Sequence, residues 1–332
     1  MDSAQSVSPD FVFSLRRATE SAALAAYDWI GRGDREGGGG AALDAMRESL
    51  AKLDFEGAAV SGQVSKDEAP QFARGDIVGK PGAAFKADVA ADPVEGTSYL
   101  ARGQTNALAV IAVAPRGTMM DPGPAFYMEK FVAEPAARGK IDPTWPTAKK
   151  LEVLGRALNK AVPDLTVYVL EKPRHRQLVE EIVATGARVA LYPAGDVAGA
   201  LMAAIPQSGI DALMGIGGVP EGLISAVAIR AMGGEFLGRM APQLQTEAIA
   251  VKQAGIDTDR WFDRDELVGS DELFFCATGI TSGLLLEGVS HSKNSYTLQT
   301  MMITGATGER QVMTSYLPLP PRAQAVTARD VA

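Results

Sequence analysis

The sequence has few of the residues that build thiolate or imidazole sites. Its 332 residues include one cysteine, Cys276, and two histidines, His175 and His291. A single cysteine excludes an intrachain disulfide framework and argues against a thiolate-rich zinc site. The two histidines lie far apart in the sequence, which gives little support to a histidine-based metal site. We interpret Cys276, within the apolar run 273–277, as a buried and inert thiol.

Long apolar runs and an excess of positive charge are also missing. The longest apolar stretches, such as 107–114 and 198–205, are much shorter than the roughly 20 residues of a membrane-spanning helix. Residues 1–10 lack the pattern of a signal peptide, so we expect a cytoplasmic protein without a membrane partner. Lys and Arg number 32 against 40 Asp and Glu, a net charge of −8, which argues against a general nucleic-acid-binding protein. An anionic substrate is still allowed, because a bound divalent metal would reverse the local charge.

Glycine is the residue that the sequence has in excess. It accounts for 35 of the 332 residues, about a tenth, against an average of about 7%. The densest run, 31–40, is predicted to be a loop between a helix at 12–30 and a second helix at 41–53. Glycine-rich turns allow a backbone to approach a phosphate group closely.

Strand-like and helical segments alternate along the rest of the chain, which predicts a layered α/β or α+β fold. We expect two halves, 11–160 and 161–316, with a flexible N-terminus at 1–10 and a disordered tail at 317–332. The predicted strands are 57–61, 85–91, 107–113, 165–170, 188–191 and 212–215. The predicted helices after residue 100 are 151–160, 176–185, 197–204 and 222–232.

The strongest local motif is Asp92-Pro-Val-Glu-Gly-Thr97, directly after a predicted strand. Two carboxylates three residues apart around a turn can both face one hard cation. Gly96 would let the backbone approach a phosphate, and the Thr97 hydroxyl could orient a water molecule. Taken alone, a solvated Asp-Pro turn explains these six residues equally well.

Two other turns carry charged residues next to predicted helices. Lys172-Pro-Arg174 precedes a helix, so two cations and free backbone N–H groups could converge on a phosphate. Glu221 follows a Gly-Gly-Val-Pro turn at the start of another helix, where a carboxylate is also simply favourable in the first turn. Tyr127 in isolation would most often be a core or rim aromatic.

Together these motifs resemble a known family. The Asp-Pro-x-Glu-Gly-Thr string is similar to the metal-binding signature of the lithium-sensitive, magnesium-dependent phosphatase superfamily. Further segments, in order from about residue 11 to 316, resemble the class II fructose-1,6-bisphosphatases. These segments are Glu20-Ser-Ala-Ala-Leu24, Trp29-Ile-Gly-Arg-Gly-Asp34, Asp67-Glu-Ala-Pro70, Gly103-Gln-Thr-Asn-Ala-Leu-Ala-Val110, Tyr127-Met-Glu-Lys130, Lys172-Pro-Arg-His175, Gly215-Ile-Gly-Gly-Val-Pro-Glu-Gly222 and Ala277-Thr-Gly-Ile-Thr281.

The resemblance implies a layered sugar-phosphatase fold, with a metal-binding N-terminal half and the site between the two halves. The implied activity is metal-dependent hydrolysis of the 1-phosphate of fructose 1,6-bisphosphate, in gluconeogenesis or Calvin-type sugar metabolism. It also implies a homo-oligomer, and Mn²⁺ or Mg²⁺ held by Asp92, Glu95 and Glu221. Asp67 and Thr97 match the pair that activates the attacking water. The matches to substrate contacts are Glu95, Gly96, Thr97, Tyr127, Lys172, Pro173, Arg174, Gly195, Asp196 and Gly218.

Several acidic positions of the family are replaced in this chain. Gly39 stands where the family has an Asp ligand, and Gln63 stands where it has a ligating Glu, so Gln63 would be at most a weak ligand through its carbonyl oxygen. Ser65, Arg35 and Ala194 replace a Glu, a Lys and a substrate-contacting Asp. Changing groups that only orient metal ligands already costs roughly 10–100-fold in affinity or activity. Losing two ligands should cost at least as much.

Two alternatives to a working fructose-1,6-bisphosphatase therefore stay open. The chain could be a catalytically impaired phosphatase that binds sugar phosphates as a sensor or as a partner in a mixed oligomer. It could also be a phosphatase that has moved to another phosphate ester. We further predict that residues 37–40 form a mobile loop that lacks its metal anchor.

Overall fold

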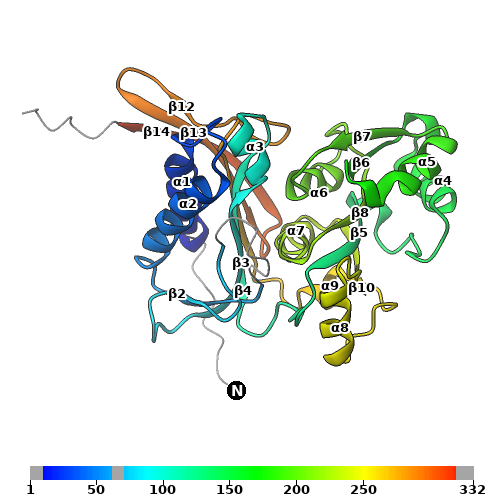
Figure 1. Ribbon diagram of the computed structural model, residues 1–332, viewed down its shortest axis with the longest axis horizontal. Coiled ribbons are helices and arrows are strands. Elements are labelled where there is room, and N and C mark those ends of the chain that lie inside the picture. The colour runs from blue at the N-terminus through cyan, green and yellow to red at the C-terminus, as the bar shows by residue number, and fades with distance from the viewer. Residues whose placement is uncertain (1–9, 62–70, 319–332) are drawn as a thin grey trace, which may run out of the picture.

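The computed structural model describes residues 10–61 and 71–318. Two β-sheets lie on either side of a central layer of two helices, α6 (Val197–Ala204) and α7 (Val219–Met232), and further helices cover the outer faces (Figure 1). The layered α/β fold predicted from the sequence is confirmed. Among the described helices, none combines the length and the apolar character needed to span a bilayer.

The first sheet has eight strands in the order β12-β13-β11-β4-β3-β1-β2, with β14 paired to β13. Strands β1 and β3 are parallel and the other pairs are antiparallel. Its outer face is covered by helices α1 (Asp10–Tyr27) and α2 (Arg35–Leu50), and α3 (Thr97–Arg102) follows β3. The strands are β1 (Glu56–Ala59), β2 (Ile77–Gly79), β3 (Lys86–Glu95), β4 (Leu108–Pro115), β11 (Phe274–Gly279), β12 (Ser290–His291), β13 (Ser295–Thr304) and β14 (Glu309–Pro318).

Strand β4 shows why a strand of this sheet has a continuous apolar sequence. Alternate side chains point to opposite faces of a strand. Val110 and Ala112 pack in the core that contains α6 and α7, whereas Ile111 and Val113 pack in the core under α1 and α2. Because both faces are covered by helices, no position of the strand interior can be polar.

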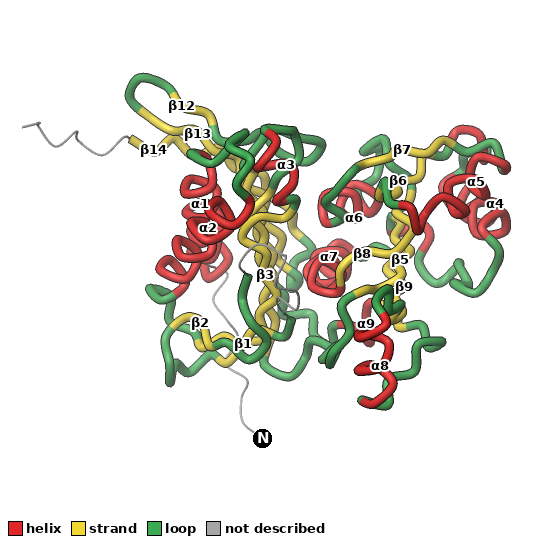
Figure 2. The backbone as a smooth tube through the Cα atoms, in the orientation of Figure 1, coloured by secondary structure: helices red, strands yellow, loops and turns green. Residues whose placement is uncertain are grey.

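The second sheet has the order β10-β9-β5-β8-β6-β7, and β6 is parallel to both β7 and β8. Its outer face is covered by α4 (Thr147–Leu158) and α5 (Arg176–Ala184), and α8 (Gln245–Gln253) and α9 (Arg264–Leu267) lie near its β9–β10 edge (Figures 1 and 2). The strands are β5 (Tyr127–Ala133), β6 (Thr166–Leu170), β7 (Arg188–Tyr192), β8 (Ala212–Gly218), β9 (Glu235–Met240) and β10 (Phe262–Asp263). Short 3₁₀ turns occur at Pro135–Ala137, Val162–Asp164 and Pro173–His175.

The chain visits the two sheets in a pattern that a single cut does not describe. It enters the second sheet at β5, before residue 160, and returns to the first sheet at β11. The division into 11–160 and 161–316 therefore does not follow sheet membership, and it stays a prediction about folding units. Residues 1–9 and 319–332, which include most of the predicted flexible ends, lie outside the described residues.

The prediction of a mobile loop at residues 37–40 is wrong. Helix α2 begins at Arg35, so these glycines lie in its first two turns. The Asp34 carboxylate accepts a hydrogen bond from the Gly37 N–H at 2.8 Å, which satisfies one of the free donors at the helix N-terminus. Gly39, where the family has its Asp ligand, is buried in this helix.

Two of the glycines of α2 serve close packing. A Cβ atom on Gly37 would collide with the Trp29 ring, and one on Gly38 would lie 2.6 Å from the Leu100 side chain. Because real Cβ contacts are never this short, larger residues would push α2 away from the preceding turn and from α3. Glycine composition alone favoured a loop, and this tertiary packing overrides it.

Candidate active site

Strand β3 ends with a bulge that holds two carboxylates. Asp92 pairs with Val110 of β4 and Glu95 pairs with Leu108, so β3 has one residue more than its partner over this stretch. Such an extra residue bends a strand and redirects its side chains. Asp92 is 4% exposed and Glu95 is 1% exposed, and both line the same cavity. The two carboxylates of the motif therefore face a common space.

This inter-sheet cavity has a volume of about 550 Å³ and lies between the ends of the two sheets. Its walls come from the end of β3, the start of α3, the turn before α5, and the segments that lead into α6 and α7. A volume in the range of roughly 300–1,000 Å³ suits a small-molecule ligand. The predicted site residues that line it are Asp92, Glu95, Gly96, Thr97, Tyr127, Lys172, Arg174, Gly195, Asp196, Gly218 and Glu221, together with the replaced positions Arg35 and Ala194.

Glu95 lies at the centre of a group of carboxylates. Burial and the neighbouring charges of Asp196, Asp92 and Glu221 raise the pKa of Glu95 well above its usual range. The Val197 N–H donates to Glu95 Oε1 at 3.3 Å. Glu95 Oε2 is buried and has no hydrogen-bond partner among the residues that the structure describes. An acceptor left in this state requires a proton or a cation.

Asp196 already has a cationic partner. Lys130 of β5 donates to Asp196 Oδ2 at 2.6 Å, and both side chains are buried. The carboxylate has room because position 217 is glycine, where a Cβ atom would overlap Asp196 Oδ2. Removing either member of such a pair would leave an uncompensated buried charge.

Glycines make room for the other carboxylates too. Gly195 has a φ of +73°, and a Cβ atom there would lie 3.0 Å from Glu95 Oε2. A Cβ atom on Gly218 would overlap the carboxylate of Glu221. Gly96, with a φ of +83°, caps the N-terminus of α3 in the left-handed conformation. At Gly195 and Gly218 the missing side chain therefore makes room for the protein's own carboxylates.

Positive charges gather on another wall of the cavity. Burial and the neighbouring charges of Arg174, Arg35 and Arg102 lower the pKa of Lys172. Within the described part of the chain, the Lys172 ammonium forms no ion pair. The Arg174 guanidinium lies over the Tyr127 ring, 5.1 Å from its centroid. A cluster of like charges with a free ammonium is suited to bind an anion.

Arg174 is fixed by the backbone of β8 and by its neighbour His175. Its guanidinium donates to the Ile216 carbonyl at 2.8 Å. The Ile216 N–H donates to His175 Nε2 at 2.7 Å, and His175 Nδ1 lies 2.7 Å from the Leu170 carbonyl. Since Nε2 accepts, the ring is neutral with its proton on Nδ1. Burial lowers the pKa of His175, in agreement with this state.

Two tyrosines hold the turn that precedes α6. The Tyr99 hydroxyl donates to the Ala194 carbonyl at 2.6 Å, and the Tyr168 hydroxyl donates to the Gly195 carbonyl. Burial raises the pKa of Tyr99 to about 12, so the hydroxyl stays protonated. The turn that places Gly195 beside Glu95 is thus anchored to both halves of the cavity.

Comparison with known proteins agrees with this geometry. The family model described as bacterial fructose-1,6-bisphosphatase, glpX-encoded, matches residues 9–317. The chain belongs to the class II fructose-1,6-bisphosphatase family. It is 40% identical over 309 residues to "Fructose-1,6-bisphosphatase 1 class 2" of Escherichia coli (strain K12), which covers 89% of this chain and 91% of the relative. The same figures hold for the class 2 fructose-1,6-bisphosphatases of Escherichia coli O6:H1 and Shigella flexneri.

The family resemblance inferred from the motifs is thereby confirmed. Class II fructose-1,6-bisphosphatases are metal-dependent, and the donor chemistry at Asp92, Glu95 and Glu221 suits a hard divalent cation. However, across residues 10–61 and 71–318 no group of three or more His, Cys, Asp or Glu side chains is arranged to hold a metal ion. The described residues of this class II chain therefore supply oxygen ligands, among them the orphaned Oε2 of Glu95, but no complete protein cage.

The remaining predicted residues fall in two places. Asp67, Gln63 and Ser65 lie outside the described residues. Pro173 begins the 3₁₀ turn between Lys172 and Arg174 without lining the cavity itself. Lys130 was not assigned a role from the sequence, although it ends the Tyr127-Met-Glu-Lys130 segment by which the class II family was recognised.

Proposed function

We propose that the protein hydrolyses the 1-phosphate of fructose 1,6-bisphosphate with a bound Mn²⁺ or Mg²⁺. The observation that carries this proposal is the division of one cavity into a carboxylate wall around Glu95 and a cationic wall with Lys172, which forms no ion pair with the described residues. A sugar with two phosphates needs such a division, because one phosphate must be held while the other reacts.

The cationic wall binds the phosphate that does not react. Lys172 and Arg174 donate charge-assisted hydrogen bonds to its oxygens. Arg174 is held in place by the Ile216 carbonyl and by the Tyr127 ring, so little side-chain freedom is lost on binding. Tyr127 also gives the sugar a flat surface beside this phosphate.

The carboxylate wall receives the phosphate that reacts. A divalent ion held there by Asp92, Glu95 and Glu221 would offset the negative charges and polarise the phosphoryl oxygens. The Thr97 hydroxyl, at the first position of α3, orients the attacking water, with Asp67 as its predicted partner. Water attacks phosphorus, the bond between phosphorus and the C1 oxygen breaks, and that oxygen takes up a proton. The products are fructose 6-phosphate and inorganic phosphate.

Phosphate release by the purified protein with Mn²⁺ or Mg²⁺ tests this proposal. We expect Asp92→Ala to lower the rate at least about a hundredfold, because a cation held through fewer carboxylates is bound weakly. Fructose 6-phosphate and other sugar phosphates, offered in parallel, show whether another ester is preferred. Release from fructose 1,6-bisphosphate no faster than that of the Asp92→Ala variant would overturn the proposal.

One observation favours a second candidate, a protein that binds sugar bisphosphates without turnover. It is the lack of a three-ligand group among the described side chains, together with Gly39 at a family ligand position. Restoring Gly39→Asp and Gln63→Glu together tests it. A large gain of metal-dependent activity over an inert parent would support the binding protein, and no gain over an active parent would exclude it.

The homo-oligomer and the cytoplasmic location expected from the sequence stay predictions. Light scattering on the purified protein would determine the assembly state.

A further inference from the structure

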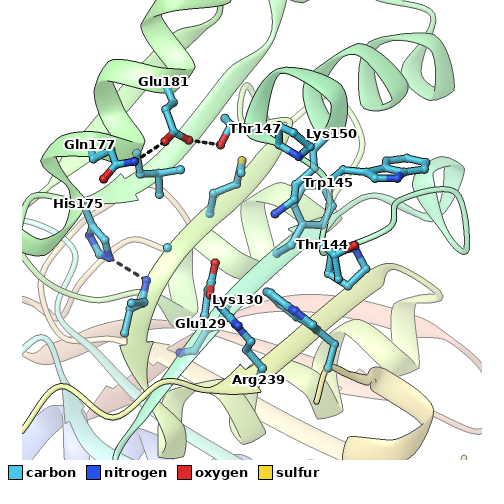
Figure 3. Close-up of a pocket in the computed structure, with 18 of the residues that line it drawn as sticks. Glu129, Lys130, Thr144, Trp145, Thr147, Lys150, His175, Gln177, Glu181 and Arg239 are labelled. Atoms are coloured by element: carbon cyan, nitrogen blue, oxygen red, sulfur yellow. Dashed lines mark hydrogen bonds and ion pairs between the residues drawn. The ribbon is translucent and has the colours of Figure 1, made fainter. Parts of the chain in front are cut away.

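A second cavity lies on the outer side of the second sheet. Its volume is about 600 Å³, and it is enclosed by the face of β5, β8 and β9 on one side and by α4, α5 and the segment before α4 on the other (Figure 3). We call it the outer cavity. Among the described residues, only Arg174 lines both cavities. Nothing in the proposed hydrolysis uses the remaining side chains of the outer cavity.

The unusual side chain of the outer cavity is Lys150. The residue is 8% exposed, and within the described chain its ammonium group makes neither a hydrogen bond nor an ion pair. The preceding residue of the same helix, Lys149, is exposed and pairs with Glu152 at 3.0 Å. Burying an ammonium without a counter-ion costs stability. Such a cost at one position of an otherwise ordinary helix points to a partner that binds from outside.

Trp261 gives the cavity a flat apolar wall, and Trp145 lies at its rim (Figure 3). Trp261 lies below the Lys150 ammonium, 5.7 Å from ring centroid to Nζ, and Trp145 lines the cavity from the segment before α4. The Arg239 guanidinium lies 5.2 Å from the centroid of the Trp261 ring, and its charge is offset by Glu129 at 2.7 Å. Within the described chain Lys150 forms no ion pair, although the carboxylates of Glu129, Asp142 and Glu181 act on its charge from a longer distance.

The opposite rim of the cavity is polar and already satisfied. Glu181 accepts hydrogen bonds from the Thr147 hydroxyl at 2.6 Å and from the Gln177 amide at 2.8 Å. These contacts, drawn in Figure 3, tie α4 to α5 and hold the cavity open without involving Lys150. The cavity is thus preformed, and Glu181 acts on the Lys150 charge only through space, without a hydrogen bond or ion pair between them.

We propose that the outer cavity is a second binding site, which takes a small organic oxyanion with a flat apolar part. The oxyanion group pairs with Lys150, and the flat part lies against Trp145 and Trp261. A phosphate ester and a carboxylate share this chemistry. The site is independent of the hydrolysis proposed above, because Lys150 and both tryptophans lie outside the inter-sheet cavity.

Tryptophan fluorescence offers a local readout of this site. The chain has three tryptophans, of which Trp145 and Trp261 line the outer cavity and Trp29 packs against α2. Phenylphosphonate is a suitable probe, since it carries an oxyanion on a flat ring and has no phosphate ester to hydrolyse. Benzoate tests the carboxylate class, and benzyl alcohol is the neutral control.

We expect saturable quenching by phenylphosphonate or benzoate and none by benzyl alcohol. Lys150→Met should weaken binding at least about tenfold, the usual loss for one charge-assisted hydrogen bond, and should raise the melting temperature by removing the unpaired buried charge. Lys149→Met is the matched control and should bind as the parent does. Lys172→Met should leave the quenching unchanged, because its cation belongs to the other cavity.

Three results would overturn the site. The first is the absence of saturable quenching by either anion. The second is equal affinity in Lys150→Met and in the parent. The third is a loss of quenching in Lys172→Met that Lys150→Met does not share, which would assign the probe to the inter-sheet cavity. Loss of phosphatase activity in any of these variants has no bearing on the outcome, so the test stands apart from the proposed function.

Discussion

The two cavities are similar in size but differ in how their charges are balanced. The inter-sheet cavity, about 550 Å³, has several buried carboxylates and several cations, and each group raises or lowers the pKa of its neighbours. The outer cavity, about 600 Å³, is lined by charged side chains of both signs and by two tryptophans, and the Lys150 ammonium forms no ion pair within the described chain. Opposing charged walls suit a reaction that must hold one phosphate and transfer another. A buried ammonium without an ion pair, beside an indole ring, suits binding alone.

The largest expected difference between the cavities is in kcat/KM, when one carboxylate of each cavity is replaced. Glu95→Gln should lower kcat/KM for fructose 1,6-bisphosphate at least about a hundredfold, since it removes an anionic ligand from the carboxylate wall. Glu129→Gln, in the outer cavity, should change it by no more than about threefold. Steady-state phosphate release checks both variants. If the two substitutions had equal effects, the assignment of chemistry to the inter-sheet cavity would be wrong.

A smaller effect is expected from one lysine of each cavity. Lys172→Met should raise KM for fructose 1,6-bisphosphate about tenfold, because it removes a charge-assisted contact to the phosphate that is held. Lys150→Met should leave this KM within about twofold of the parent value. The comparison needs initial rates over a range of substrate concentrations. A rise of KM in Lys150→Met as large as that in Lys172→Met would show that the two cavities act as one functional unit.

The smallest effect concerns His175, which lies between the cavities. Burial lowers its pKa below the usual 6.5, so the unfolded chain takes up a proton first as the pH falls. The stability linked to this ring is complete above the usual pKa and is lost as the pH falls through it toward the folded-state value.

Urea unfolding at pH 7.5 and pH 5.5 measures this loss. The parent should lose more stability on acidification than His175→Gln, by a few tenths of a molar in the urea midpoint. The exposed His291 is the natural control, and His291→Gln should behave as the parent does. An identical pH response of parent and His175→Gln would show that the buried ring does not resist protonation.

Much of the inter-sheet cavity could be predicted because its residues come in short motifs. Asp92 to Thr97 and Lys172 to Arg174 each place several functional groups within a few residues, at strand ends where the fold brings them together. Lys130 could not be predicted in the same way. Its contact with Asp196 joins positions 66 residues apart, and no local pattern distinguishes it from a surface lysine.

In the outer cavity and in helix α2, the local sequence predicts the wrong environment or the wrong secondary structure. Lys150 sits in a stretch rich in proline and basic residues, where a lysine is expected to be solvated, and only the packing of α4 on the sheet buries it. Residues 37–40 show the reverse case. Their composition favours a loop, yet the cap at Asp34 and the close approach of Trp29 make a helix there. In both cases tertiary contacts reverse a local preference.

The central claim is that the inter-sheet cavity turns over fructose 1,6-bisphosphate at its 1-phosphate. Phosphorus NMR on the protein with Mg²⁺ and this substrate tests it directly, since it separates substrate, fructose 6-phosphate and inorganic phosphate. We expect fructose 6-phosphate and inorganic phosphate to appear together with the parent and to be absent with Asp92→Ala. Fructose 1-phosphate as the product, or substrate signals that broaden without any product, would contradict it.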